Sequence, residues 1–160
     1  MVELTVARLL HVLGVVFWIG GVAFVTTVLL PATRRLKTPE ERMEFFEAVE
    51  LGFARQARIT ILITGFSGLY IIYKLNLWQR FLYVEYWWMH AMVAVWFLFA
   101  LMLFVLEPIW LHQYFIERAR RDPDGTFMMV TRMHWLLLAV SLITVAGAVA
   151  GSHGYLLFTG

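Results

Sequence analysis

The sequence predicts an all-α integral membrane protein, a single transmembrane domain over residues 1–160 that folds as a four-helix bundle. Composition is the first observation: 61% of the residues are hydrophobic and only 15% are charged, far from the averages of soluble proteins. The second observation is a set of apolar runs, each long enough for a helix that crosses a bilayer, which takes about 20 residues. These runs cover residues 9–30, 59–77, 86–106 and 135–158.

The first run is interpreted as a retained span. It lacks the basic start of a signal peptide, it is longer than a signal peptide's apolar core, and no A-x-A-like cleavage site precedes Pro31. All four runs are therefore assigned to the membrane domain, with the lipid bilayer as its surroundings.

Basic residues are concentrated in two connections, and this predicts the topology. The positive-inside rule places both connections in the cytoplasm and both termini on the outer, periplasmic side of a prokaryotic inner membrane. Positive charge in such loops faces lipid headgroups and does not indicate nucleic-acid binding. Asparagine occurs once, at Asn76, which is compatible with a thermophilic source. Ten of the 13 Lys and Arg residues lie in these connections: Arg34, Arg35, Lys37, Arg42, Arg55, Arg58, Arg118, Arg120, Arg121 and Arg132.

The first connection has its own helical signals. Thr38 and Glu41 have the spacing of a capping box, and Pro39 suits the first helical position. Val49 and Phe53 follow at helical spacing among interleaved glutamates. These features predict an amphipathic cytoplasmic helix over residues 39–58 that runs into the second span.

Prolines predict two further boundaries. Pro108, after Glu107, is expected to end the third span, because proline lacks the backbone donor and its ring clashes with the preceding turn. Residues 122–125, Asp-Pro-Asp-Gly, are expected to form a turn in the last cytoplasmic loop.

Three histidines lie inside the apolar runs. His11, His90 and His153 come from the first, third and fourth runs, about 6–9 Å inside their outer ends at the 1.5 Å rise of a helix. Ionisable side chains at this depth are expensive, which favours a bound metal or haem in the outer half of the bundle. His112 and His134 lie near the cytoplasmic ends, where a second site and a place among the headgroups both stay open.

The neighbours of these histidines favour a bulky, flat ligand. Gly14 and Trp18 follow His11 at helical spacings, Ala94 follows His90 by four residues, and Ala150 shares a face with His153. Small residues leave room for a porphyrin, and aromatic residues pack its edge. Packing between helices, including association into a homo-oligomer, explains small residues equally well, and an interfacial belt explains the tryptophans.

The absence of cysteine narrows the chemistry. Without cysteine there is no thiolate ligand and no covalent attachment of a c-type haem. Imidazole suits iron and copper alike. The preferred cofactor is haem b with His11 and His90 as axial ligands to the iron and His153 as the alternative ligand. The other candidate is copper, for which Met89 and Met92 could add soft ligands.

Several motifs resemble the CopD-like and HemJ-like membrane families. The stretch from His11 through Trp18, Gly20 and Gly21 to Pro31 resembles their opening helix. Residues 53–58, Phe-Ala-Arg-Gln-Ala-Arg, resemble the entry to their second helix, and residues 88–92, Trp-Met-His-Ala-Met, resemble their third. The families are linked to copper resistance and to oxygen-independent protoporphyrinogen oxidation. The resemblance implies a haem b site at His11, with His90 as the third-helix histidine.

The resulting expectation is a haem b-binding membrane cytochrome that transfers electrons with a quinone or a redox partner protein. A copper-handling membrane protein and a HemJ-like protoporphyrinogen oxidase are the alternatives, and a structural subunit of a larger complex is a further one. Catalytic turnover, as a haem-dependent membrane oxidoreductase, stays open. The chain has no Walker, Rossmann or nucleophile-elbow motif.

Overall fold

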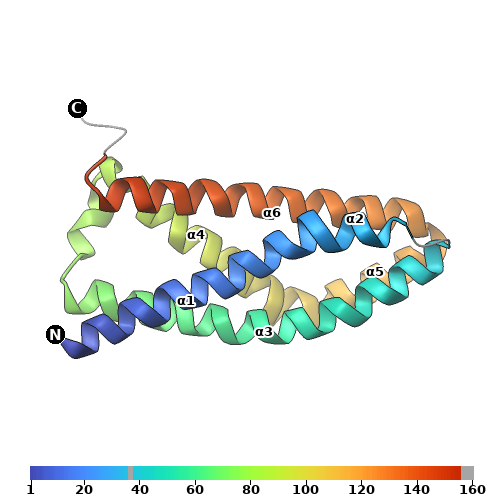
Figure 1. The fold of residues 1–160 in the computed structure, drawn as a ribbon, viewed down its shortest axis with the longest axis horizontal. Helices are drawn as coiled ribbons and strands as arrows, with labels where there is room; N and C mark the ends of the chain where they lie inside the picture. The colour runs from blue at the N-terminus through green and yellow to red at the C-terminus, as the bar shows by residue number, and fades with distance from the viewer. Residues whose placement is uncertain (36–37, 156–160) are drawn as a thin grey trace.

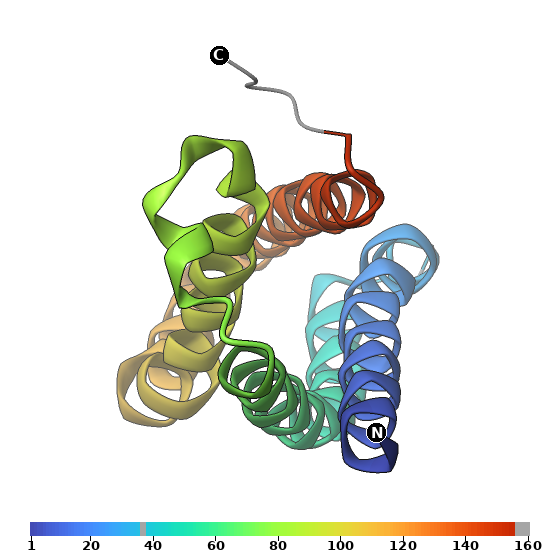
Figure 2. The same cartoon turned by 90° about the vertical axis from the view of Figure 1, so that its left-hand side faces the viewer.

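A computed structural model describes residues 1–35 and 38–155, and every regular element in these ranges is helical, as predicted. The long helices surround a common centre, and the N-terminus and the end of the last helix lie at the same end of the molecule (Figures 1 and 2). In chain order the elements are α1 Val2–Phe24, the π-helix η1 Val25–Leu29, α2 Leu30–Thr33, α3 Pro39–Lys74, the 3₁₀ helices η2 Trp78–Leu82 and η3 Val84–Tyr86, α4 Trp87–Leu101, the π-helix η4 Met102–Leu111, α5 His112–Arg121 and α6 Pro123–Ser152.

The first three elements, α1, η1 and α2, follow one another without a break and form one continuous helix. Its middle contains two adjacent threonines whose hydroxyls donate back to the preceding turn, Thr26 to Val22 O and Thr27 to Ala23 O, both at 2.7 Å. Such back-bonding satisfies a hydroxyl inside an apolar helix but competes with the regular backbone ladder. The π-helical turn η1 lies at this place.

The start of α3 follows the predicted capping box. Thr38 Oγ1 accepts from the Glu41 backbone N–H, and the Glu41 carboxylate accepts from the Thr38 N–H, both at 3.2 Å. From there α3 is one uninterrupted helix to Lys74. Several side chains of its first turns lie outside the described part of the structure, so the predicted amphipathic face of residues 39–58 stays a prediction.

Pro108 does not end the third span, which corrects the sequence prediction. The chain continues through Pro108 as the π-helix η4 and then as α5, up to Arg121. A π-helix bonds to the fifth residue back rather than the fourth, so it accommodates a residue without a backbone donor and with a bulky ring. The rod of α4, η4 and α5 is consequently longer than the predicted span.

The turn predicted at residues 122–125 is shorter in the structure, where the single residue Asp122 connects α5 to α6. Asp122 ends α5 and caps α6, because its side chain accepts from the Gly125 backbone N–H at 2.9 Å. The fourth helix thus begins at Pro123, well before residue 135, and ends at Ser152 rather than 158. The end is set by Gly154, whose φ of +86° favours glycine. Residues 156–158 of the predicted span lie outside the described residues.

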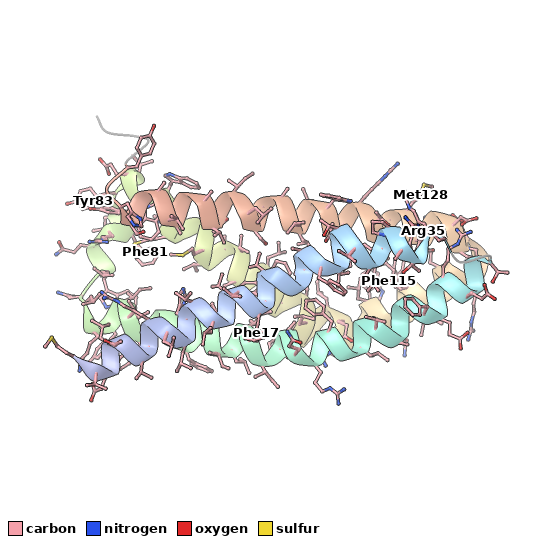
Figure 3. All side chains as sticks on the ribbon, viewed as in Figure 1. Phe17, Arg35, Phe81, Tyr83, Phe115 and Met128 are labelled. Carbon is pink, nitrogen blue, oxygen red and sulfur yellow. The ribbon has the colours of Figure 1, made fainter. Side chains whose placement is uncertain are left out.

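Three stretches among the described residues are long and apolar enough to cross a membrane: Val2–Thr33, Val84–Leu111 and Pro123–Ser152. Large apolar side chains cover their outer surfaces, Phe17 and Met128 among them (Figure 3). An exposed apolar surface of this extent fits a lipid environment and not water. Helix α3 is not among the three, so the crossing predicted for residues 59–77 and the orientation of the termini stay predictions.

The two basic connections lie at the same end of the bundle, opposite the N-terminus (Figure 1). There Arg42 pairs with Asp124 at 2.8 Å and joins the first turn of α3 to the start of α6. At the other end, Glu3 of α1 accepts from the Tyr70 hydroxyl at 2.9 Å and pairs with Lys74 at 3.4 Å. Lys37 lies outside the described residues.

The core lies between α1, α3, α4 and α6. Trp18 is at its centre and meets Phe99 edge to face, with ring centroids 5.0 Å apart. The strongest interhelical packing is between α1 and α3, and α4 packs mainly on α6. The buried residues of this cluster are Trp18, Ile19, Val22, Ile61, Val95, Phe99, Leu137 and Leu138.

Candidate functional site

His11 lies on α1, half-buried against α3. Its Nδ1 is 3.0 Å from the carbonyl oxygen of Thr64 and 3.4 Å from the Ser67 hydroxyl. Because a carbonyl oxygen only accepts, Nδ1 carries the proton and donates it to Thr64, and the lone pair lies on Nε2. Gly68 makes room for the ring, since a Cβ there would come within 3.0 Å of His11 Cε1. The imidazole is thus held in one tautomer and one orientation.

His90 lies at the start of α4 and is exposed. Its Nε2 donates to the carbonyl oxygen of Phe81 at 3.0 Å, and the Phe81 ring meets the imidazole edge to face with centroids 5.3 Å apart. The nitrogen with the lone pair is therefore Nδ1. To bind a metal through Nε2, His90 must first give up its bond to Phe81.

His153 caps the end of α6 and is exposed. Its Nδ1 donates to the carbonyl oxygen of Val149 at 2.8 Å, one turn earlier on its own helix. Each of the three outer histidines is thus engaged with a different element. Within the described residues, no three His, Cys, Asp or Glu side chains lie close enough together to hold a metal ion.

The small residues near the outer histidines serve different neighbours. Gly14 faces Thr64 of α3, so it allows the close packing of α1 and α3 that also holds His11. Ala94 is exposed and Ala150 is half-buried. On α6, Gly147 and Gly151 face the indole rings of Trp87 and Trp88 respectively. The space beside these two glycines is therefore filled by tryptophan from the neighbouring helix α4.

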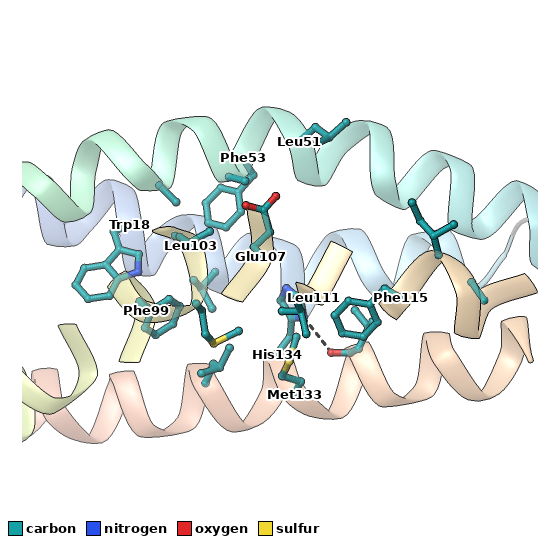
Figure 4. Close-up of a pocket in the computed structure, with 18 of the residues that line it drawn as sticks. Trp18, Leu51, Phe53, Phe99, Leu103, Glu107, Leu111, Phe115, Met133 and His134 are labelled. Atoms are coloured by element: carbon teal, nitrogen blue, oxygen red, sulfur yellow. Dashed lines mark hydrogen bonds between the residues drawn. The ribbon is translucent and has the colours of Figure 1, made fainter. Parts of the chain in front are cut away.

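Trp18 belongs to the core rather than to a membrane-surface belt. Only 4% of it is exposed. Its Nε1 has no hydrogen-bond partner in the described part of the chain. One side of the ring lines a cavity of about 520 Å³ in the half of the bundle away from the N-terminus (Figure 4).

The cavity is lined by all of the long helices. Its walls are mostly aromatic and aliphatic, with Phe53 from α3, Phe99 from α4 and Phe115 from α5 (Figure 4). His134 of α6 is a polar member of the wall, only 7% exposed, and its Nδ1 donates to Val130 O at 2.9 Å. The side chain of His112, its partner in the inner site left open by the sequence, lies outside the described residues.

Glu107 is a second polar group of the cavity that the sequence analysis did not assign to a site. It lies on η4, and its carboxylate pairs with the guanidinium of Arg58, whose Nε also donates to the Leu103 carbonyl oxygen at 3.2 Å. Two signals pointed to this pair. Opposite charges lie at the ends of the second and third runs that are predicted to be cytoplasmic. Pro108 directly follows Glu107, and π-helical turns such as η4 are frequent at functional sites.

Comparisons of the chain with models of protein families, with curated proteins and with solved structures find no match. The resemblance to the CopD-like and HemJ-like families therefore stays a prediction from the motifs around His11 and His90. A functional conclusion depends on the geometry and chemistry of the sites themselves.

Proposed function

We propose that the protein is a membrane cytochrome that binds haem b through His11 and transfers electrons within the membrane. One observation carries the proposal. His11 donates from Nδ1 to the Thr64 carbonyl oxygen at 3.0 Å, with its ring against Gly68. Metal-binding histidines typically donate their second ring nitrogen to a carbonyl or carboxylate, which fixes the tautomer and offers the other nitrogen to the metal.

The residues around His11 fit this role chemically. Thr64 and Ser67 supply a polar lining at an otherwise apolar contact between α1 and α3, and each hydroxyl also bonds to its own helix, to Thr60 O at 2.8 Å and Ile63 O at 2.5 Å. These bonds stabilise the backbone that orients the imidazole. When bound, haem would supply reversible one-electron chemistry, and the low-dielectric surroundings would tune its potential. His90 and His153 are the candidates for a second ligand.

An absorption spectrum of the purified protein, oxidised and reduced with dithionite, tests this function together with iron and copper contents of the same sample. We expect a Soret band with sharp reduced α and β bands, and iron in proportion to protein. A colourless sample that stays haem-free after incubation with haemin would contradict the proposal. Copper in that colourless sample would favour a copper-handling protein instead.

A further inference from the structure

The cavity around Trp18 has the size and lining of a small-molecule site. Its volume of about 520 Å³ lies within the roughly 300–1,000 Å³ range of ligand and cofactor sites. Leu51, which borders the cavity, is 54% exposed, so the cavity reaches the outer surface of the bundle. Leu51 belongs to residues 39–58, which the sequence predicts to lie at the cytoplasmic surface of the membrane, so a molecule could enter the cavity from that surface. The cavity is separate from His11, which is not among its lining residues.

Trp18 supplies a hydrogen-bond donor that nothing in the described chain accepts. The indole Nε1 is buried and unpartnered, and Figure 4 shows it on the side of the ring that faces the other lining residues. A buried donor without an acceptor carries the full cost of its desolvation. A ligand with an oxygen acceptor on an apolar ring would satisfy the donor and fill the apolar space in one step.

The polar groups further along the cavity extend this chemistry. Glu107, paired with Arg58, lies in the wall with His134 (Figure 4). Arg120 also lines the cavity, and its guanidinium donates hydrogen bonds, whereas the Glu107 carboxylate accepts them. The cavity thus combines apolar walls with groups that can bind both carbonyl and hydroxyl oxygens.

We propose that this cavity binds a lipid-soluble quinone, with Trp18 Nε1 donating to one carbonyl oxygen. Quinones combine a flat apolar ring, two carbonyl acceptors and solubility in the bilayer, and their reduced form carries hydroxyl donors in the same places. Binding itself is independent of haem, but a role for the quinone as electron donor or acceptor rests on the proposed function. The polar side chains that line the site include Trp18, Glu107, Arg120 and His134, and Arg58 pairs with Glu107.

The test compares two ligands with the same tail in the detergent-purified full chain. Decylubiquinone carries the carbonyl oxygens, and decylbenzene does not. Binding is measured as the saturable shift of the thermal unfolding midpoint with ligand concentration. Trp18→Phe keeps the aromatic packing and removes the donor. Trp88→Phe is the matched control, because Trp88 Nε1 is also buried and unpartnered in the described chain but lies outside the cavity.

We expect decylubiquinone to bind wild type and Trp88→Phe equally, and Trp18→Phe about three- to tenfold more weakly, the loss of one hydrogen bond. Leu103→Phe, which fills the cavity with a larger side chain, is expected to abolish the shift while the helical circular dichroism stays unchanged. Equal binding of decylbenzene, or unchanged affinity in both Trp18→Phe and Leu103→Phe, would overturn the proposal.

The outcomes also separate this site from the haem. A colourless protein that binds decylubiquinone in a Trp18-dependent way would overturn the proposed cytochrome function and leave the quinone site standing. A haem-containing protein whose stability does not respond to decylubiquinone would overturn the quinone site and leave the proposed cytochrome function standing.

Discussion

The position of His11 shows how the neighbouring helix α3 fixes the orientation of a single imidazole. The ring is flanked by a carbonyl oxygen, a hydroxyl and a glycine, all from α3, and each has a separate effect. Thr64 O sets the tautomer, Ser67 lies within 3.4 Å of the same nitrogen, and Gly68 allows the helices to approach. His90 and His153 also donate to a carbonyl oxygen, but unlike His11 both are exposed.

A paired glycine substitution tests the role of this setting. In Gly68→Ala the new Cβ would lie 3.0 Å from His11 Cε1, which forces the ring to shift. We predict about tenfold weaker haem binding, as for other changes that reorient a metal ligand. Gly20→Ala is the control, because its Cβ would meet no atom of the described residues within 4 Å. Haem titration followed at the Soret band measures both, and equal affinities would exclude a role for the Gly68 contact.

The Arg58–Glu107 pair is expected to stabilise the bundle as a unit. Both side chains are half-buried, with 36% and 26% exposed. Removing one partner leaves the charge of the other without compensation. Removing both partners leaves no uncompensated charge. In a double-mutant cycle of Arg58→Met and Glu107→Leu, we predict a coupling energy of about 1–3 kcal/mol from denaturant unfolding in detergent. Additive effects of the two substitutions would contradict an energetic role for the pair.

Among the elements, those with local signals were predictable and those set by neighbouring helices were not. The start of α3 follows from the capping box formed by Thr38 and Glu41, which lie within one stretch of four residues. The sequence alone therefore locates it. The passage of a helix through Pro108 depends on π-helical turns and on the packing of η4 against α3. That context is not visible in a pattern of apolar residues, so the sequence alone predicts that the span ends at the proline.

The candidate sites follow the same division. The depth of His11 in the membrane can be predicted by counting residues along a helix. Its contact with Thr64 cannot, because the rotation of α1 relative to α3 decides which α3 residue His11 contacts. The cavity was missed for a related reason. The sequence predicts Trp18 beside a haem at His11 and Phe53 in an amphipathic helix, and only tertiary packing brings both together with His134.

The capping box of α3 gives a prediction at the scale of one element. Thr38→Ala removes the acceptor for the Glu41 N–H, which now lies at 3.2 Å from Thr38 Oγ1. We predict a loss of about 0.5–2 kcal/mol in the free energy of unfolding. Thr38→Ser keeps a hydroxyl at the same place and should restore most of it. Equal destabilisation by both substitutions would show that the cap does not contribute through this bond.

At the scale of the whole molecule, the charge distribution predicts a topology that single cysteines can test. The chain contains no cysteine, so each introduced thiol is unique. Gln79 lies at the same end as the N-terminus and Ala48 at the basic end, and both are exposed. We predict that a membrane-impermeant maleimide added to intact cells labels Gln79→Cys and not Ala48→Cys. The opposite labelling pattern would invert the topology.

The molecule separates two sites along the bundle. His11 binds to α3 in the half near the N-terminus, and the cavity of Trp18 and His134 lies towards the basic end. Under the predicted topology, a quinone in the cavity would lie towards the cytoplasm and a haem at His11 towards the outside. Electrons exchanged between them would cross part of the membrane thickness.

Haem content in two histidine variants tests the central claim, haem ligation by His11, most directly. His11→Ala and His134→Ala are purified in parallel with wild type, and the haem-to-protein ratio is measured from the reduced pyridine haemochrome spectrum. We predict that His11→Ala loses the haem, whereas His134→Ala retains it at the wild-type ratio. If His11→Ala retained the haem and His134→Ala lost it, the claim would be contradicted, and the haem would be assigned to the cavity instead.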